Sequence, residues 1–548
     1  MLHRRRRVVI PINNPFTFAA VTDRVFGVSL LTILGVVLLG GTLDVMEVDA
    51  AQYAGMSRDM LQRGDALRLF YRGQDHLDKP PLLFWLSALS FQLFGVCNFS
   101  YRLPSILFAF LGLYSTYRFT ALYHGTATAR LATILFGCSS AFFLMCNDVR
   151  CDTLLTGSVI TAIWLGCTWL ERGGIGWLIG AALAVSAGML AKGPIGLVAP
   201  VLAIGGQVIA TRKWRRLRDP QLLVALLVIG LALLPMCIGL YQQHGLHGLR
   251  FYFWEQSFGR VTGENRWKDD STAFFFTHEL LWQMLPWTLF VLAGLWTSIL
   301  SIWKRNVLAE YASISGALLV FGAISLSQFK LPHYLFVITP LFAVLGATGI
   351  HAYVPRTLLR LHYLVVAVLA LLVGFLTFIV FPTHRWPFLA LLILASGLAG
   401  VALWREGARK AMVQVSVIFM AAVGLVMNGY FYPNLLAYQA NARAGQWAAD
   451  RGLGPDQFFG MQISGTALDF YTGHPVRWIS NAGEARSVIR PGVVIYTDSA
   501  HRAELIVNGL VPKGETTLKN YPAQRLALPF LDPAERASVV TDRYLLSY

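Results

Sequence analysis

Long apolar stretches recur along most of this chain, and they constrain its fold more than any other feature. A helix needs about 20 residues to cross the hydrocarbon core of a bilayer. Charged residues make up 14% of the 548 residues, against about a quarter in soluble domains. The sequence therefore predicts a mainly α, polytopic membrane protein with about 13 transmembrane helices. The thirteen stretches are 26–44, 102–121, 129–147, 153–170, 174–191, 195–211, 221–242, 281–303, 308–327, 332–353, 359–381, 387–404 and 411–432.

The segment 81–96 is apolar but short, so it either crosses the membrane or lies in its interface. Lys79 and Pro80 precede it, and Cys97 and Asn98 follow it. Basic residues decide between the two, because cytoplasmic loops are enriched in Lys and Arg. An interfacial 81–96 puts the N-terminus and every basic cluster in the cytoplasm and the C-terminus in the periplasm. The clusters are Arg4–Arg7, Arg212–Arg218, Lys304–Arg305, Arg356–Arg360 and Arg405–Lys410.

The pattern of residue types along the chain changes at about residue 435. From there, short runs alternate with Gly, Pro and charged stretches; the runs are DQFFGMQI at 456–463, PVRWIS at 475–480 and GVVIYTDS at 492–499. Such runs are typical of short strands. We expect a soluble periplasmic α/β domain over 435–548, after a transmembrane domain over 1–434. The first periplasmic loop of that domain, 45–101, is expected to carry interfacial helices.

The formal net charge of +16 does not indicate a nucleic-acid partner. The basic residues sit in short loops between spans, where anionic lipid and topology explain them. The six cysteines form no CxxC pair and no Cys/His metal spacing. We therefore expect no required cofactor or metal, although His76 and Asp78, with Glu264 and His278 elsewhere, could hold an adventitious divalent ion.

Ionisable residues gather in the loops of the predicted outer face. They are either ordinary solvated charges or the lining of a cavity. Four separate loops supply both carboxylates and cations to one face, which favours a cavity, because charges near the membrane core need water, a partner or a ligand. The candidate catalytic residues are Asp49 and Asp152. The candidate substrate-binding residues are Tyr53, Arg58, Lys79, Lys192, Arg266, Lys330, His333 and Tyr334.

These residue types suit chemistry on a phosphorylated sugar. Asp49 follows the first span, where a carboxylate can act as a base or hold a hydroxyl group. Asp152 begins the fourth span, where it could instead be a simple helix N-cap. Lysine and arginine neutralise phosphate, and Lys79 is expected at headgroup depth. Tyr53 and Tyr334 could hold sugar or phosphate, or belong to the aromatic belts.

Several motifs, in this order, resemble the bacterial aminoarabinose lipid A transferases of the ArnT type. These belong to the GT-C group, which includes protein O-mannosyltransferases. The matching runs are DAAQYAGMSRDM at 49–60, LDKPPLLFW at 77–85, YRLPS at 101–105, AKGPIGLVAP at 191–200, FWEQSFGRVTGENRW at 253–267 and FKLPHYLFVITP at 329–340. The chain departs from the family at Ala50, where a second carboxylate usually stands, so no role of that carboxylate is carried over.

The resemblance implies a GT-C fold and a glycosyltransferase in the bacterial inner membrane. The donor would be 4-amino-4-deoxy-L-arabinose on undecaprenyl phosphate, and the acceptor a lipid A phosphate. Lys79 and Arg266 would meet the leaving phosphate. Asp49, with Asp152 assisting, would orient the acceptor or stabilise charge at the anomeric carbon.

Two other functions remain open at this point. Another GT-C enzyme using a polyprenyl-phosphate sugar, such as a protein O-mannosyltransferase, differs only in its acceptor. A transporter or flippase should show charges deep inside its spans and paired broken helices. Here the charges gather at one face, and the first half of the chain does not repeat in the second.

Overall fold

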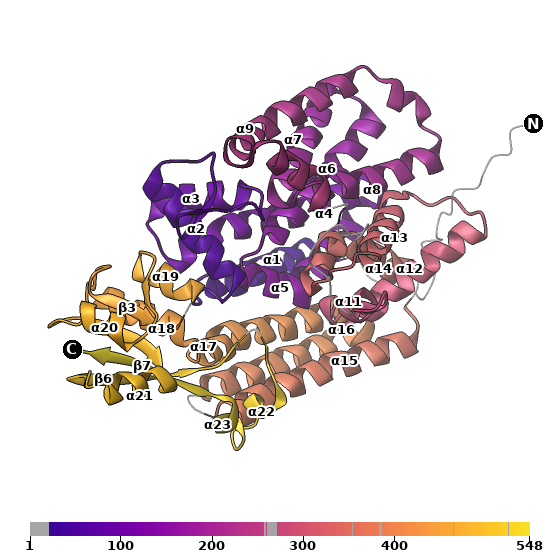
Figure 1. Cartoon of the computed structure of the whole chain (residues 1–548). Helices are drawn as coiled ribbons and strands as arrows, with labels where there is room; N and C mark the ends of the chain where they lie inside the picture. The colour runs from indigo at the N-terminus through magenta and orange to yellow at the C-terminus, as the bar shows by residue number, and fades with distance from the viewer. Residues whose placement is uncertain are drawn as a thin grey trace, which may run out of the picture.

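The computed structural model describes residues 21–256, 259, 271–352, 354–382, 386–463, 465–523 and 525–548. Figure 1 shows a bundle of helices up to residue 436, with the C-terminal α/β region, residues 440–548, at one end of the bundle. The first loop, residues 45–101, lies at that same end, beside the C-terminal α/β region (Figure 1). The described fold is mainly α, as predicted.

Helices in the first half of the bundle are α1 (Asp23–Gly40), α4 (Asn98–Gly137), α5 (Ser140–Asn147), α6 (Cys151–Arg172), α7 (Ile175–Lys192), α8 (Ile195–Thr211) and α9 (Gln221–Arg250). A 3-10 turn, Trp214–Arg218, precedes α9, and a π-helical turn, Phe251–Glu255, extends it. In the second half they are α11 (Phe275–Gln283), α12 (Thr288–Trp303), α13 (Ala312–Ser325), α14 (Thr339–Ala352), α15 (Arg356–Phe375), α16 (Trp386–Val426) and α17 (Tyr432–Leu436). A 3-10 turn at Pro332–Ile338 leads into α14, and π-helical turns at Leu376–Val380 and Met427–Phe431 follow α15 and α16.

Two of the long helices are folded back on themselves at a glycine. Gly125 in α4 and Gly407 in α16 have φ values of 80° and 73°, a backbone region that glycine adopts without steric cost. A Cβ built on Gly112 would lie 3.4 Å from the Phe136 ring, so the two arms of α4 run antiparallel. Ala399 and Val415 share one cluster in the same way on the arms of α16.

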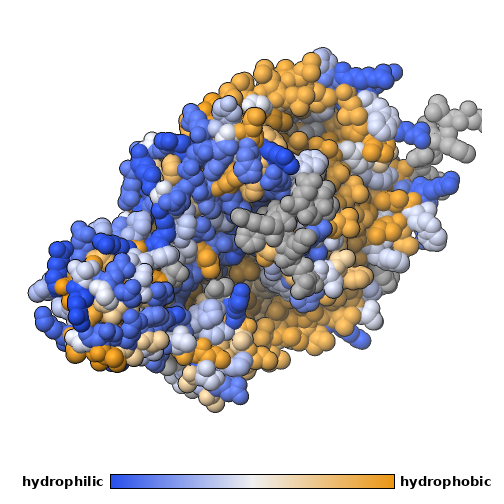
Figure 2. Space-filling model, in the orientation of Figure 1, coloured by the Kyte–Doolittle hydropathy of each residue, from blue (hydrophilic) through white to orange (hydrophobic). Residues whose placement is uncertain are grey.

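Each of the thirteen predicted stretches overlaps helix when these arms are counted separately. Two of them cross a bend between helices: 129–147 crosses the 54° bend between α4 and α5, and 281–303 the 119° bend between α11 and α12. By length and apolarity, seven described helices could cross a membrane, or nine if each bent pair is one span. The chain is thus a multi-pass membrane protein, and thirteen as the number of spans stays a prediction. Figure 2 shows hydrophobic surface over the helical body, between the hydrophilic C-terminal end and hydrophilic side chains at the opposite edge.

The first loop holds two helices and a hairpin. These are α2 (Asp49–Arg63), the strands β1 (Phe70–Tyr71) and β2 (Gln74–Asp75), and α3 (Leu82–Phe94). Helix α3 has 13 residues, so it is about 20 Å long and too short to cross a core of about 30 Å. Its Phe84 packs against Tyr53 of α2. Leu89, Leu93 and Phe94 are exposed, as expected of a helix that lies in the membrane interface.

The C-terminal α/β region is built on a five-stranded sheet with the order β4-β3-β5-β7-β6. The strands are β3 (Phe458–Met461), β4 (Arg477–Ile479), β5 (Val494–Asp498), β6 (Gly514–Asn520) and β7 (Thr541–Ser547). The first three in sequence pair in parallel, and β7 joins β5 and β6 in antiparallel register. The helices are α18 (Ala440–Asp450), α19 (Thr466–Thr472), α20 (Ala482–Val488), α21 (Ser499–Val507), α22 (Leu528–Leu531) and α23 (Arg536–Val539).

The three runs predicted as strands are β3, β4 and β5. Side chains alternate between the two faces of a strand. Phe458 and Val494 therefore lie in the core on one face of the sheet, and Phe459 and Ile495 in the core on the other. Burial on both faces explains why β3 and β5 are almost continuously apolar, whereas β4 is exposed at its first two residues. The predicted boundary at 434/435 falls inside α17, which continues the last helical arm of the bundle.

Candidate active site

One cavity collects most of the predicted site residues. It holds about 1230 Å³ of empty space, part of which is open to solvent. The first loop, the starts of α6 and α8, the end of α7 and the segment from α13 to α14 all contribute. The lining residues are Asp49, Tyr53, Lys79, Pro80, Arg150, Cys151, Asp152, Leu155, Lys192, Pro194, Ile195, Val198, Gln256, Ala323, Ile324, Ser327, Leu331, His333, Tyr334 and Val337.

Asp49 and Tyr53 reach the cavity from the first two turns of α2. They are four residues apart on the helix and so share a face. Arg150 donates from Nη1 to Oδ2 of Asp49 at 2.9 Å, and from Nε to Oδ2 of Asp148 at 2.6 Å. Burial, together with nearby negative charge that includes Asp49, raises the pKa of Tyr53 well above its usual value. The Tyr53 hydroxyl therefore stays protonated and can donate a hydrogen bond.

Asp152 is the centre of a second group. It lies in the first turn of α6 with a side chain only 3% exposed, and it forms an ion pair with Lys192 at the end of α7. His333 Nε2 lies 3.7 Å from the other carboxylate oxygen, and the Lys192 ammonium stands 4.0 Å from the centre of the Tyr334 ring. Arg150 occupies the N-cap position of α6. Asp152 is therefore not a helix N-cap, and its carboxylate holds Lys192 in the cavity wall.

Lys79 enters the cavity from the segment before α3. Its Nζ lies 2.7 Å from Oδ2 of Asp78, and Gln256 donates a hydrogen bond to the Asp78 carbonyl. Burial lowers the pKa of Lys79, but the adjacent Asp78 carboxylate more than offsets this, so the pKa is raised overall. Lys79 is therefore an ammonium ion at neutral pH.

The lining of the cavity has a polar part and an apolar part. Its polar part contains three cations, Lys79, Arg150 and Lys192, and two carboxylates, so the charge of the described lining favours an anion. Its other part is formed by apolar side chains from four helical elements: Leu155, Ile195, Val198, Ala323, Ile324 and Val337. A ligand that matches both parts is amphipathic, with an anionic group joined to an apolar chain.

Nine of the ten predicted site residues have described positions, and seven of them line the cavity. Lys330 donates to the Ser271 carbonyl at 3.1 Å and stands outside the lining. Arg58 lies on the side of α2 opposite Asp49, where it contacts the C-terminal α/β region. Arg266 lies outside the described residues.

Sequence reasoning missed Arg150 as a site residue. In the sequence, Arg150 is one charged residue in a short loop. Nothing in the pattern DVRCD at 148–152 distinguishes it from an ordinary solvated arginine. The contact that gives it a role joins it to Asp49, 101 positions earlier in the chain. Gln256 was missed for a similar reason, because an amide carries no charge signal.

Within the described part of the chain, no group of three or more His, Cys, Asp or Glu side chains is arranged to hold a metal ion. Glu264, one of the residues suggested for an adventitious ion, lies outside the described residues. The expectation that no metal is required therefore stays a prediction.

Known proteins resemble this chain in sequence. A family model described as dolichyl-phosphate-mannose-protein mannosyltransferase matches residues 78–238. Two relatives are named undecaprenyl phosphate-alpha-4-amino-4-deoxy-L-arabinose arabinosyl transferase. The protein of Edwardsiella ictaluri is 28% identical over 58% of this chain and 57% of its own length. The protein of Enterobacter sp. is 26% identical over 81% of this chain and 78% of its own length. The match to the first relative thus spans little more than half of that protein.

A solved structure shows the same fold. ArnT from Cupriavidus metallidurans bound to undecaprenyl phosphate superposes with a TM-score of 0.71, at 19% identity, over 89% of this chain and 95% of its own. At an identity of 19%, this match supports a shared fold and nothing about function. In sequence similarity and in fold, this chain matches the ArnT-type GT-C glycosyltransferases, and the resemblance inferred from its motifs is confirmed.

Proposed function

We propose that this protein transfers 4-amino-4-deoxy-L-arabinose from undecaprenyl phosphate to a phosphate of lipid A, at the periplasmic face of the bacterial inner membrane. The observation that carries the proposal is the single cavity in which three cations and two carboxylates meet an apolar wall. The related proteins named as arabinosyl transferases support this choice of donor. The proposed orientation has a cytoplasmic N-terminus and a periplasmic C-terminal region.

The donor phosphate fits the polar part of the cavity. Lys79 and Lys192 are point charges on separate elements, so together they can neutralise a phosphate that becomes more negative as it leaves. The apolar wall of Leu155, Ile195 and Val198 is suited to the first units of a polyprenyl chain. Burying that chain contributes about 0.8 kcal/mol per methylene group, which gives the donor affinity without contact to the sugar.

The acceptor requires little proton chemistry. A phosphate monoester is already ionised at neutral pH, so its oxygen can attack the anomeric carbon without a general base. A new bond forms between that oxygen and the anomeric carbon, and the bond from the anomeric carbon to the carrier phosphate breaks. Undecaprenyl phosphate leaves with the electron pair. Asp49, held by Arg150, then acts by electrostatic stabilisation of the positive charge that develops at the sugar, and by positioning.

The second candidate is a transferase that delivers a sugar to a protein hydroxyl group. The mannosyltransferase family model over residues 78–238 favours it. A hydroxyl acceptor must lose its proton, so Asp49 would then serve as a general base. The cavity contacts are the same for either acceptor, and the difference lies in the product.

A direct assay separates the candidates. The purified protein is mixed with undecaprenyl-phosphate aminoarabinose and lipid A, and the lipid product is measured by mass spectrometry. We expect lipid A to gain one aminoarabinose, and lipid A from cells that lack the gene to lose that species. Unmodified lipid A together with glycosylated secreted protein would replace this proposal with the second candidate.

A further inference from the structure

The short helix α19 of the C-terminal α/β region forms hydrogen bonds with the first loop. The Ala467 amide donates to Oε1 of Glu47 at 3.2 Å, and the Thr466 hydroxyl donates to the Val48 carbonyl at 2.9 Å. Glu47 and Val48 immediately precede Asp49, the first residue of α2. Helix α19 thus fixes the chain at the point where it enters the cavity wall.

A buried arginine makes the second contact between α19 and α2. Arg58 is only 3% exposed, and its Nη1 donates to the carbonyls of Asp469 and Phe470 at 2.7 and 3.1 Å. These carbonyls belong to the last turn of α19, where a cation is favoured. The same guanidinium is paired with Asp59 at 2.7 Å. The two carbonyls add acceptors to this desolvated guanidinium, so losing them would leave Asp59 as its remaining partner among the described residues.

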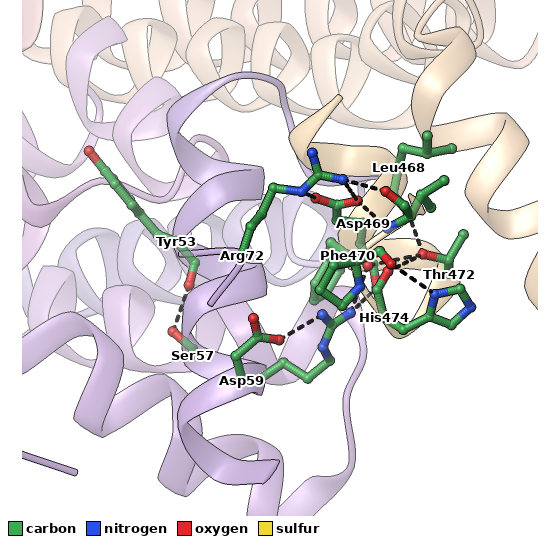
Figure 3. A network of polar contacts seen from close by, with 12 residues as sticks. Tyr53, Ser57, Asp59, Arg72, Leu468, Asp469, Phe470, Thr472 and His474 are labelled. Carbon is green, nitrogen blue, oxygen red and sulfur yellow. Dashed lines mark hydrogen bonds and ion pairs between the residues drawn. The ribbon is translucent and has the colours of Figure 1, made fainter. Parts of the chain in front are cut away.

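The third contact holds the hairpin that leads to Lys79. Arg72 lies at the tip of that hairpin, and its Nε is 2.9 Å from Oδ2 of Asp469 (Figure 3). Arg72 also donates to the Val476 carbonyl at 2.6 Å, and the Val476 amide donates to Oδ1 of Asp469 at 2.8 Å. Its guanidinium stacks at 4.0 Å on the ring of Trp478. The Asp469 carboxylate is therefore held by Arg72 at one oxygen and by the Val476 amide at the other, and 9% of its side chain is exposed.

The second and third contacts lie, along the chain, between Asp49 and Lys79, the two first-loop residues that reach the cavity with a charge. Arg58 follows Asp49 on α2, and Arg72 precedes Lys79 along the loop. In Figure 3, Tyr53 points away from α19, toward the other side of α2. The face of α2 that lines the cavity and the face that α19 holds are thus opposite faces of one helix.

We propose that Asp469 is a positioning residue for the cavity, acting through Arg72 and, by its backbone carbonyl, through Arg58. It holds α2 and the hairpin in one arrangement, so that Asp49 and Lys79 meet the same substrate. The C-terminal α/β region then contributes to the rate of sugar transfer through the first loop, without touching the substrate at this point. This proposal rests on the transferase activity proposed above.

The kinetic test uses Asp469→Asn, with Asp498→Asn as the matched control. Asp498 is also a carboxylate of the C-terminal α/β region and pairs with His501 and Arg543, but neither partner is in the first loop. A misplacement of about 1 Å at a reacting centre can cost about 100-fold, so we expect kcat of Asp469→Asn to fall about 10- to 100-fold. The KM for lipid A should stay within about twofold of the wild type, and Asp498→Asn should keep the wild-type kcat.

A double-mutant cycle and a rescue exclude a general loss of folding. Arg72→Gln should lower kcat as Asp469→Asn does, and the double variant should be little worse than either single variant, because both remove one contact. Asp469→Glu, which keeps the charge, should recover part of the rate. Additive losses, an unchanged kcat in Asp469→Asn, or a raised KM for lipid A with normal kcat would overturn the proposal.

A second readout does not depend on the reaction. Nitroxide labels at the exposed residues Gln62 of α2 and Gln242 of α9 report the distance between the first loop and the bundle, in a chain with Cys97 and Cys237 changed to Ser. We expect a narrow distance distribution in the wild type and in Asp498→Asn, and a broad one in Asp469→Asn. An equally narrow distribution in Asp469→Asn contradicts the positioning role. A wild-type protein that transfers no sugar but shows these distributions contradicts the proposed function only.

Discussion

Arg150 and Asp49 are joined by a 2.9 Å ion pair between segments that lie 101 positions apart in the chain. The same guanidinium holds Asp148 through Nε, so its orientation is fixed from within its own loop. Together these contacts raise the pKa of Arg150, despite its burial. Of the two carboxylates in the described lining of the cavity, this pair positions the more exposed one, whose side chain is 43% exposed.

Asp49→Asn tests the electrostatic role of that carboxylate. The amide keeps the shape but loses the charge that would stabilise a positive anomeric carbon, so we expect kcat to fall about 100- to 1,000-fold. The donor KM should change little. Turnover is measured with purified donor and lipid A, and Asp75→Asn, an exposed carboxylate of the same loop, serves as the control. Near wild-type turnover in Asp49→Asn would remove Asp49 from the mechanism.

Lys79→Ala tests the phosphate contact. A hydrogen bond to a charged group contributes about 1.5–3 kcal/mol, so we expect kcat/KM for the donor to fall about 10- to 100-fold. Because the pKa of Lys79 is raised, its contribution should remain constant from pH 6 to pH 9. Lys513→Ala, at an exposed site of the C-terminal α/β region, should leave the donor kinetics unchanged. Unchanged kinetics in Lys79→Ala would place the phosphate elsewhere.

Arg150→Lys tests whether the Asp49 pair needs a planar guanidinium. Lysine is a point charge and cannot reproduce the two fixed directions in which Arg150 meets Asp49 and Asp148. We expect kcat to fall about tenfold, a smaller loss than that in Asp49→Asn, because the charge near the carboxylate is retained. The exposed Arg486→Lys is the control. A wild-type kcat in Arg150→Lys would show that charge alone is sufficient.

The helices were predictable because a bilayer imposes a length and an apolar composition on each span. The same reasoning identified the segment 81–96 as too short, and α3 has 13 residues. The strands β3, β4 and β5 were predictable from their apolar runs, whereas β6 and β7 were not. The β6 segment GETTLKN is mostly exposed, so it carries little hydrophobic signal, and it is held by pairing with β7.

The site was predictable where charge and position coincide, at Asp49, Lys79, Asp152 and Lys192. The position of Arg58 could not be predicted in this way. As a charged residue within the first motif it was expected to bind substrate, but it lies on the other face of α2 and contacts carbonyls about 411 positions away. The sequence shows which residues share a face of α2. It does not show that α19, about 411 positions later in the chain, covers the face with Arg58. Arg150 was overlooked for the same reason.

The interface between the first loop and the C-terminal α/β region should respond to pH through Glu47. Burial raises the pKa of Glu47 above 4.5, while its hydrogen bonds from Asn441 and Ala467 partly oppose this. Between the unfolded and folded pKa values, the native state binds more protons than the unfolded state, so stability falls as pH rises through this range. Glu47→Gln keeps an acceptor oxygen without the charge, so it should reduce this pH dependence. Thermal unfolding midpoints of both proteins at pH 4.5, 6 and 8 measure the effect, and identical pH profiles would contradict it.

The orientation proposed for the chain in the membrane is consistent with which ends of α8 and α13 line the cavity. Ile195 at the start of α8 and Ile324 at the end of α13 are both lining residues. Arg212 follows the opposite end of α8, and Lys304 follows α12, in the loop that leads to the opposite end of α13. Both belong to basic clusters that we place in the cytoplasm. The C-terminal α/β region packs against the first loop, which supplies part of the cavity lining, and Lys513 of that region is exposed.

Cysteine labelling tests this orientation in spheroplasts that carry the Cys97→Ser, Cys237→Ser background. A membrane-impermeant maleimide should modify Lys513→Cys in intact spheroplasts, because the proposed orientation exposes that site to the periplasm. It should modify Lys304→Cys only after the membrane is permeabilised. The background without either new cysteine is the control, since its remaining cysteines are buried. Labelling of Lys304→Cys in intact spheroplasts would turn the cavity toward the cytoplasm, where lipid A phosphates of the outer leaflet could not reach Asp49.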